Sequence, residues 1–445
     1  MNKSTEKTTI DDYGDVKAGV RTDGMPYWAE RELSSEFVEA KQKRPGIDKP
    51  FLLITIVLLT IGLIMVLSAS YASAYYLSGE PLRFFSRQLI FAVSGVALML
   101  IVSRVSVRTM SRWSSHLLLI SIALLVLVLI IGITVNGAKR WMGIGGENST
   151  LSFQPSEIAK LAIVLAYAQM ACKFGVARMK TFKFGVAPFA AITAIIILLL
   201  SRQPHLSAAI IISALTVVMM FASGTRFRWF LLAGLCTVVM AGILLFPSIL
   251  NTARESGVQG VVEHTTKTQL DFSGYGYAGR RIDAWLNPEA DPLGDGFQIR
   301  QSLYAVGSGG LLGQGLGQSR QKYLYLPEEH NDYIFAIVCE ELGFIGAMLI
   351  LMLFLLLIVR GFWLALHAND KYSSLIVIGI TSLLAIQVFL NVAVVINLVP
   401  ATGISLPFFS YGGTALWIQL VQIGIVLAVS RDIPAHKTDE TESAE

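Results

Sequence analysis

Charged side chains are scarce in this sequence. Of its 445 residues, 15% are charged and 54% are hydrophobic, whereas about a quarter of a typical soluble domain is charged. The mean hydropathy is +0.61, and about ten apolar runs approach the ~20 residues that a membrane-spanning helix needs. These runs are continuous and lack the alternation of a transmembrane β-barrel. The shortage of charge excludes a soluble globular class, and we predict an all-α, polytopic integral membrane protein.

Cysteine is also rare, and its placement indicates neither a disulfide framework nor a metal site. The three cysteines, Cys172, Cys236 and Cys339, are scattered in or beside apolar runs without metal-ligand spacing. The pattern of a cleavable signal peptide is lacking too, because about 50 polar residues precede a first apolar run of full span length. We expect this run to act as an uncleaved anchor. The net charge of +4 gives no indication of nucleic-acid binding.

The apolar runs divide the chain into three predicted parts. We expect residues 1–50 to form a largely disordered cytoplasmic tail, residues 51–430 a transmembrane domain, and residues 431–445 an acidic cytoplasmic tail. The predicted spans are 51–71, 89–102, 117–135, 156–172, 189–200, 208–222, 230–250, 333–359, 375–395 and 409–430. The loop at 251–331 is far longer than an ordinary connection, which predicts a functional role or a structure of its own.

Lysine and arginine determine the predicted orientation. They occur in the N-terminal tail and in the loops after the second, fourth, sixth and eighth spans, so the positive-inside rule places both termini in the cytoplasm. Asp332, the Lys139–Arg140 pair and the 400–409 loop then lie on the outer side. No inverted repeat is evident in the sequence, which weakens an interpretation as a transporter.

The stretch 323–343 is the strongest candidate for a functional site. Its polar cluster runs directly into the apolar run that begins at Tyr333, and Asp332 lies at the junction. Ionisable residues at the mouth of a membrane helix are costly and are therefore functional candidates. Asp332 is interpreted either as a helix N-cap or as a general base whose pKa is tuned by partial burial. The neighbouring Glu328 and His330 are interpreted either as solvated or as holding the loop in shape.

A second candidate site is cationic. Lys139 and Arg140 lie on the predicted outer side, while Glu157 and Lys160 share one helix face and can pair. Basic residues beside Trp141 are typical of an interfacial anchor. A cationic pair on the outer side also suits a phosphate group. The sequence leaves both interpretations open.

Three further segments attract attention. The glycines of 307–317 have a GxGxxG-like spacing, but no buried strand precedes them, so a dinucleotide-binding fold is rejected. These glycines permit tight turns and close approach of the backbone to a ligand. The pattern of residues 298–305 predicts a short amphipathic helix near the membrane interface. The 397–415 segment is predicted to be re-entrant or tightly folded, and Ser410 with its neighbouring glycines lets the last span pack closely. His205 is interpreted as structural.

Several of these stretches together resemble a known family. They are GAKRW at 137–141, FQPSEIAK at 153–160, the block at 287–343 that ends in LPEEHNDYIFAIVCEELG, and PATGISLPFFSYGG at 400–413. The chain resembles the SEDS family (shape, elongation, division and sporulation), which includes FtsW, RodA and SpoVE, and it is more similar to the division and sporulation branch. Two positions depart from the family's pattern, with His205 where an Asp is usual and Asn331 where a Thr is usual.

The resemblance implies a peptidoglycan glycosyltransferase. Such an enzyme joins lipid II disaccharide-pentapeptides into glycan and releases undecaprenyl pyrophosphate, here in septal wall synthesis during division or sporulation. It implies Asp332 as the essential acid, a class B penicillin-binding protein and other divisome proteins as partners, and the bacterial plasma membrane, at the septum, as the location. The residues expected to bind substrate are Lys139, Arg140, Glu157, Lys160, Gln301, Ser302, Lys322, Glu328, His330 and Ser410.

Two other points stay open at this stage. A divalent cation, Mg²⁺ or Mn²⁺, is a candidate cofactor, and no metal ligands are assigned. The alternatives to a polymerase are a lipid II flippase and a non-catalytic scaffold of the division machinery. Against the flippase, the charged groups lie at the predicted outer face, and few ionisable residues occur at mid-span.

Overall fold

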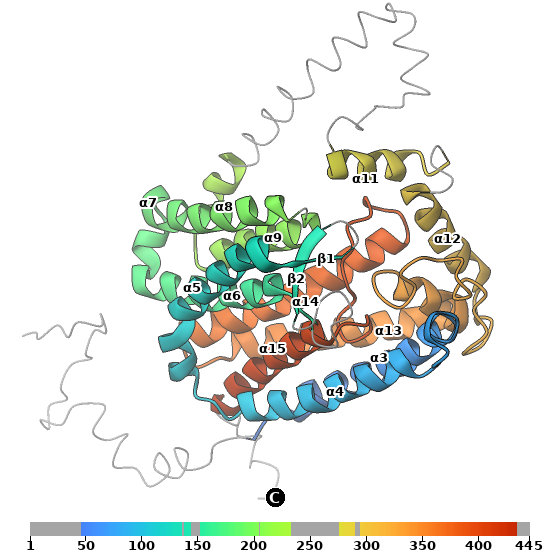
Figure 1. Cartoon of the computed structure of the whole chain (residues 1–445). Helices are drawn as coiled ribbons and strands as arrows, with labels where there is room; N and C mark the ends of the chain where they lie inside the picture. The colour runs from blue at the N-terminus through green and yellow to red at the C-terminus, as the bar shows by residue number, and fades with distance from the viewer. Residues whose placement is uncertain are drawn as a thin grey trace, which may run out of the picture. The chain divides into compact units, whose positions relative to one another are not determined.

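The computed structural model describes residues 46–135, 138–143, 152–203, 205–232, 276–289 and 294–433. Most of both predicted terminal tails, and most of the predicted seventh span at 230–250, therefore lie outside the described residues. Residues 48–50, assigned to the N-terminal tail, instead begin the first described helix, and residues 431–432, assigned to the C-terminal tail, end the last one. Within the described part, the chain forms a bundle of helices with a small sheet and two short helices beside it (Figure 1).

The predicted all-α membrane fold is confirmed. Eight of the described helices are long and apolar enough to cross a membrane. The helices of the bundle are α3 (Lys49–Ser78), α4 (Arg83–Val102), α5 (Val107–Ile131), α6 (Pro155–Met179), α7 (Phe182–Gly185), α8 (Ala187–Arg202), α9 (Leu206–Ala222), α13 (Ile334–Leu366), α14 (Lys371–Val395) and α15 (Gly413–Asp432). The spanning segment Phe182–Arg202 combines α7 and α8, and α9 is a shorter apolar helix.

The ends of the first span show how the sequence determines a helix. Asp48 accepts a hydrogen bond from the backbone N–H of Phe51 at 2.8 Å, and Pro50 occupies the first turn. Both choices suit a helix N-terminus, where backbone N–H groups lack partners and proline loses nothing. Arg360 of α13 pairs with the same carboxylate at 2.6 Å. One aspartate thus starts α3 and fixes it to α13.

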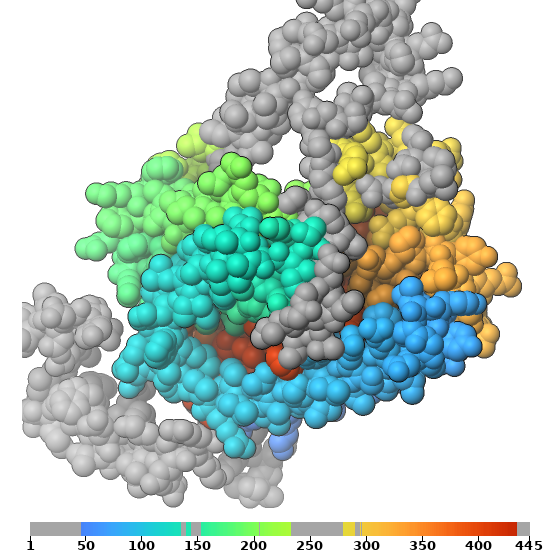
Figure 2. All heavy atoms as spheres, in the orientation of Figure 1, coloured from blue at the N-terminus to red at the C-terminus, as the bar shows by residue number. Residues whose placement is uncertain are grey.

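The centre of the bundle is formed by α14 and α15. The helix α14 packs against α6, α9 and α13, while α15 contacts α4, where the ring centroids of Trp417 and Phe91 are 5.2 Å apart. Most side chains of both helices are buried. In the face that Figure 2 shows, little of α15 reaches the surface, and the visible part lies between α4 and α5.

A three-stranded antiparallel sheet was not predicted. Its strands are β1 (Ile133–Val135), β2 (Ala138–Gly143) and β3 (Ser152–Phe153), in the order β1-β2-β3. The prediction that the third span continues to residue 135 is therefore wrong, because α5 ends at Ile131 and Gly132 has an extended backbone. The β-branched residues after Gly132 favour the strand conformation.

The described part of the long loop contains two helices, α11 (Gly276–Leu286) and α12 (Asp295–Ser308). The helix predicted at 298–305 is confirmed and is longer than predicted. Two hydrogen bonds attach this region to the C-terminal end of α14 and the residues that follow it. Trp285 donates to the carbonyl of Asn397 at 3.0 Å, and Ser302 donates to the carbonyl of Val395 at 2.8 Å. The last predicted span also begins later than expected, since α15 starts at Gly413 after an irregular segment.

Candidate functional site

Asp332 lies in the turn immediately before α13, and its backbone is held from two sides. Asn391 of α14 donates to the carbonyl of Asp332 at 2.8 Å and to the carbonyl of Ile404 at 2.7 Å. Ser410 donates to the carbonyl of Asn331 at 2.8 Å. The turn, α14 and the 397–412 segment, which are distant in sequence, thus form one hydrogen-bonded unit around Asp332.

The N-cap interpretation of Asp332 is not supported by this geometry. The N-cap residue of α13 is Tyr333, and no side-chain hydrogen bond caps this helix. The carboxylate of Asp332 instead lies against Gly403, where a β-carbon would come within 3.0 Å of its Oδ2 atom. Gly403 also has a φ of 68°, a conformation that favours glycine. The loop backbone therefore approaches the carboxylate closely, in the way that a pre-formed site requires.

The surroundings of Asp332 make it a weaker acid than usual. Burial is the main reason that its pKa rises to about 6, and the neighbouring Glu328 raises the pKa further. Arg281, Arg140 and His330 act in the opposite direction and lower it. A carboxyl group poised near neutral pH, with cations close enough to affect it, has the properties of a general base.

Arg140 lies close enough to Asp332 and to His205 for its charge to affect both of them. It lies on β2, and its Nε atom donates to the carbonyl of Gln203 at 3.3 Å. Lys139 is exposed, and since successive side chains of a strand point to opposite faces, it points away from Arg140. The structure therefore brings only one member of the predicted pair to the site.

The predicted pairing of Glu157 with Lys160 is confirmed. Their side chains form an ion pair of 2.8 Å and are both buried. His205 lies in the same region, where Gln154 contacts its Nε2 atom at 3.4 Å. Burial, Arg140 and Lys160 lower the pKa of His205 to about 3. His205 is therefore neutral at physiological pH.

His330 and Glu328 adjoin Asp332 in the chain. The ring of His330 packs against Phe84, with 4.6 Å between ring centroids, and approaches Tyr411 at 5.7 Å. Glu328 has a φ of 57° and accepts a hydrogen bond from the side chain of Asn331. Both residues shape the turn, and their charges act on Asp332.

Among the other residues predicted to bind substrate, Lys322, Ser302 and Ser410 form bonds within the protein. Lys322 is buried and paired with Glu341 at 2.9 Å. Ser302 bonds to α14, as described above. The hydroxyl of Ser410 accepts from the N–H of Leu406 at 2.7 Å in addition to its bond with Asn331. Gln301, on α12, is half-buried.

Two residues of the site, Arg281 and Asn391, were not singled out from the sequence. Arg281 is part of a run of polar loop residues and gave no signal of its own. Gly403 was interpreted only as a residue that keeps its loop tightly folded, and its contact with Asp332 was not predicted. Asn391 did have a signal in the sequence. An amide side chain inside an apolar span is costly, which marks it as a candidate for a functional role.

A protein-built metal site is not evident near Asp332. Among the described residues, no group of three or more His, Cys, Asp or Glu side chains could hold a metal ion. Mg²⁺ commonly takes only one or two carboxylates and completes its coordination with water and substrate phosphates. The expected divalent cation would therefore have to be held largely by the substrate, and it stays a prediction.

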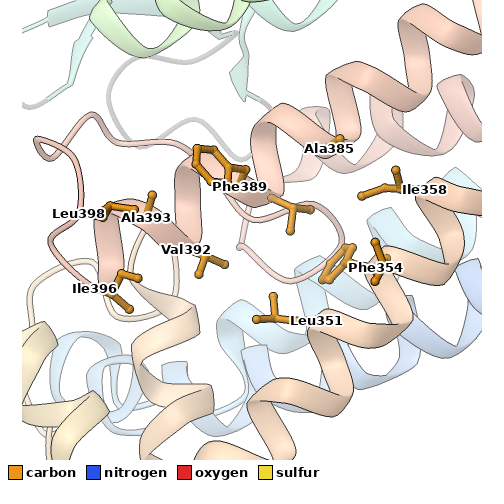
Figure 3. Close-up of a pocket in the computed structure, with 11 residues that line it drawn as sticks. Leu351, Phe354, Ile358, Ala385, Phe389, Val392, Ala393, Ile396 and Leu398 are labelled. Atoms are coloured by element: carbon orange, nitrogen blue, oxygen red, sulfur yellow. The ribbon is translucent and has the colours of Figure 1, made fainter.

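An apolar groove of about 290 Å³ lies between α13 and α14. Figure 3 shows Leu351 and Phe354 of α13 and Phe389 and Val392 of α14 among the residues that line it. The lining residues are Leu351, Phe354, Leu355, Ile358, Ala385, Val388, Phe389, Val392, Ala393, Ile396 and Leu398. A hydrocarbon chain is the kind of ligand that such a lining accommodates.

The family model FTSW_RODA_SPOVE, described as a cell cycle protein, matches residues 49–434. The chain is 43% identical over 394 residues to stage V sporulation protein E of Bacillus subtilis, covering 87% of this chain and 98% of that protein. It is 38% identical over 385 residues to the probable peptidoglycan glycosyltransferase FtsW of Trichlorobacter lovleyi, covering 86% and 93% of the two chains.

Solved structures have the same fold. A chain from a study of polymerization and crosslinking by a peptidoglycan synthase complex matches with a TM-score of 0.68 and 27% identity, covering 88% of this chain and 99% of that one. The rod shape determining protein RodA of Thermus thermophilus matches with a TM-score of 0.60 and 26% identity, covering 87% and 97%.

Proposed function

Because the chain belongs to the FtsW, RodA and SpoVE family of cell cycle proteins, we infer that it is a peptidoglycan glycosyltransferase of the division and sporulation branch. The environment of Asp332 is the observation that supports assigning this activity to a particular residue. Its carboxyl group is partly buried, lies close enough to Arg281 and Arg140 to be affected by their charges, and has a pKa of about 6. The enzyme joins lipid II units into glycan and releases undecaprenyl pyrophosphate.

We propose that Asp332 is the general base. It accepts the proton of the sugar 4-hydroxyl of one lipid II molecule while that oxygen forms a bond to the anomeric carbon of the growing glycan. The bond from this carbon to the pyrophosphate oxygen breaks, and undecaprenyl pyrophosphate leaves with the bonding electron pair. General-base assistance typically contributes about 10²–10⁴-fold to a rate.

Arg140 is the residue best placed to stabilise the leaving group. Its charge acts on both Asp332 and the region of Lys160 and His205, and a guanidinium binds phosphate oxygens with two parallel hydrogen bonds. Lys160 is held by Glu157 and adds positive potential to the same region. Charge that develops on the pyrophosphate oxygen is thereby stabilised in the transition state.

Precise placement of Asp332 contributes to the rate independently of its acidity. The two hydrogen bonds from Asn391 and the close contact with Gly403 fix the turn before substrate arrives. Reacting groups held in a near-attack arrangement avoid much of the entropic cost of a reaction between two molecules. The apolar groove between α13 and α14 suits a polyprenyl chain, which would tether a lipid substrate to the enzyme.

We also propose the cellular setting. The protein spans the membrane several times, and the distribution of basic residues supports cytoplasmic termini and an outward-facing site. The structural likeness to a chain of a peptidoglycan synthase complex supports a class B penicillin-binding protein as partner. Location at the septum, together with other divisome proteins, follows from the likeness to FtsW and SpoVE.

Polymerisation of labelled lipid II in detergent tests this function. Detergent removes the two compartments that a flippase needs, so only a polymerase produces a glycan ladder on a gel. We expect wild-type protein with a class B penicillin-binding protein to form the ladder and Arg140→Gln to weaken it strongly. Lys139→Gln is the matched control and should retain activity. Transport of lipid II across vesicle membranes without any glycan product would contradict the proposal.

A further inference from the structure

The helix α13 is interrupted at Gly343, and a loop fills the break. Gly343 has a φ of 68° and a non-helical backbone. The N–H groups of Phe344 and Ile345, on the far side of the break, donate to the carbonyls of Gly310 and Leu311 at 2.9 and 3.1 Å. In return, residues 314 and 315 donate to the carbonyls of residues 340 and 341, each at 3.0 Å.

We call residues 309–317, GGLLGQGLG, the glycine loop. Its contact with α13 is backbone against backbone and leaves no room for side chains. A β-carbon on Gly343 would lie 2.2 Å from the backbone nitrogen of Gly313, and one on Gly313 would lie 2.2 Å from the carbonyl oxygen of Glu341. The loop is therefore fixed at the level of residues 340–345 of α13.

The exposed surface of α13 places this level at the outer edge of the membrane. Residues 334–341 are all buried within the protein, and exposed large apolar side chains begin at Phe344. From Phe344 to Leu366 the helix rises roughly 34 Å at ~1.5 Å per residue, close to the hydrocarbon thickness of about 30 Å. The lipid-facing part of α13 therefore begins beside the glycine loop.

A second helix gives the same level independently. From Phe51 to Tyr71, α3 rises roughly 30 Å. Ser68, less than one turn before Tyr71, donates to the carboxylate of Glu341 at 2.7 Å. Tyr71, Tyr75 and Tyr76 are all exposed at this end of α3, and exposed tyrosines are typical of the membrane interface.

The glycine loop exposes apolar side chains where the two helices place the membrane edge. Leu311 is 68% exposed, Leu312 81% and Leu316 53%. The loop contains no charged residue. Irregular backbone is tolerated at membrane depth only where its polar groups have partners, and the hydrogen bonds to α13 supply partners for part of this backbone.

We propose that the glycine loop is a membrane-inserted rim, in which Leu311, Leu312 and Leu316 lie among the acyl chains of the outer leaflet. In this position the loop extends the lipid-facing surface of α13 sideways. It also anchors the segment that leads from α12 to Asp332 at a constant depth. The break at Gly343 lets Phe344 and Ile345 donate to carbonyls of the loop, so that part of the loop backbone keeps its partners where the loop reaches the lipid.

Site-directed spin labelling tests this proposal. A nitroxide is attached at Leu312→Cys in a variant whose three native cysteines are replaced, in vesicles of phosphatidylethanolamine and phosphatidylglycerol. Collision with dissolved oxygen is compared with collision with a water-soluble nickel chelate. Leu349→Cys, at a 62% exposed position in the lipid-facing part of α13, and Leu286→Cys, at a 44% exposed position on α11, are the comparison sites.

We expect the label at 312 to behave like that at 349, with frequent oxygen and rare nickel collisions. Nickel access equal to that at 286 would overturn the proposal, because the loop would then lie in water. Exclusion of both oxygen and the nickel chelate from the label at 312 would also overturn the proposal, whether it occurs in the protein alone or only with a class B penicillin-binding protein. The loop would then be a protein-docking surface. Leu316→Cys repeats the test if the first variant does not elute as wild type.

Discussion

The raised pKa of Asp332 gives the reaction a characteristic pH dependence. The proposed general base must be ionised, and its pKa is about 6, so kcat/KM should fall about tenfold per pH unit below that value. Arg281 lowers this pKa and Glu328 raises it. Arg281→Gln should therefore move the acid limb of the profile to higher pH, and Glu328→Gln should move it to lower pH. Shifts of both variants in the same direction would refute the assignment.

Asn391 is a positioning residue in this account. Asn391→Leu keeps the size of the side chain but removes its hydrogen bond to the carbonyl of Asp332 and the one that joins α14 to the carbonyl of Ile404. A misplacement of about 1 Å can cost roughly 10²-fold in rate, so we expect kcat to fall by about that factor while KM changes little. Gln387→Leu, one turn earlier on α14, is the control for loss of a buried amide. Equal losses in the two variants would indicate a general packing effect.

At the scale of elements, the break in α13 makes a prediction about stability. Gly343→Ala places a β-carbon 2.2 Å from backbone atoms at a φ of 68°, so it should destabilise the fold by more than about 2 kcal/mol. Gly307→Ala lies on α12 with nothing within 4 Å of the added carbon and should be neutral or slightly stabilising. Thermal unfolding in detergent compares the two variants, and similar melting temperatures would contradict this description of the break.

The loop between α12 and Asp332 depends on two buried glutamates. Glu341 pairs with Lys322 at 2.9 Å, and Glu340 accepts from the N–H groups of Arg320 and Gln321 at 3.0 and 3.3 Å. Removing one partner of a buried ion pair typically costs about 3–5 kcal/mol. We expect Lys322→Met to lower the melting temperature sharply.

The double variant Lys322→Met with Glu341→Gln should recover most of that loss, because it leaves no uncompensated buried charge. A single variant as stable as wild type would instead return Lys322 to the substrate-binding role predicted from the sequence.

The helices of the bundle were easier to predict from the sequence than the sheet and the buried pair of Lys322 and Glu341. The spans were predictable, because runs such as 375–395 are long and predominantly apolar. The sheet was missed, because Ile133–Val135 continues the apolar character of α5 and only Gly132 marks the change. Lys322 resembled an accessible cation in a polar loop, and its burial against Glu341 follows from a tertiary contact that no local pattern encodes.

The candidate site was predictable where a local sequence pattern identified a residue, and not where only tertiary packing brings a residue to Asp332. Asp332 stood out because a carboxylate at the start of an apolar run is costly, and the Glu157–Lys160 pair followed from helical spacing. Arg281 and Gly403 reach Asp332 only through the packing of α11 and of the loop before α15. Which of Lys139 and Arg140 faces the site was decided by the unpredicted strand β2.

At the scale of the whole molecule, a divalent cation is expected to act with the substrate rather than in a protein cage. EDTA should therefore reduce glycan synthesis without lowering the melting temperature of the substrate-free protein. Readdition of Mg²⁺ or Mn²⁺ should restore the activity. A melting temperature that falls with EDTA would indicate a metal bound by the protein itself.

We propose above all that a membrane-embedded polymerase uses Asp332 as its base. The most direct measurement follows glycan formation from labelled lipid II by wild type and by Asp332→Asn, each purified with a class B penicillin-binding protein. We predict that Asp332→Asn forms no ladder, although it is as stable as wild type and retains its partner. A ladder of wild-type length and rate from this variant would contradict the account.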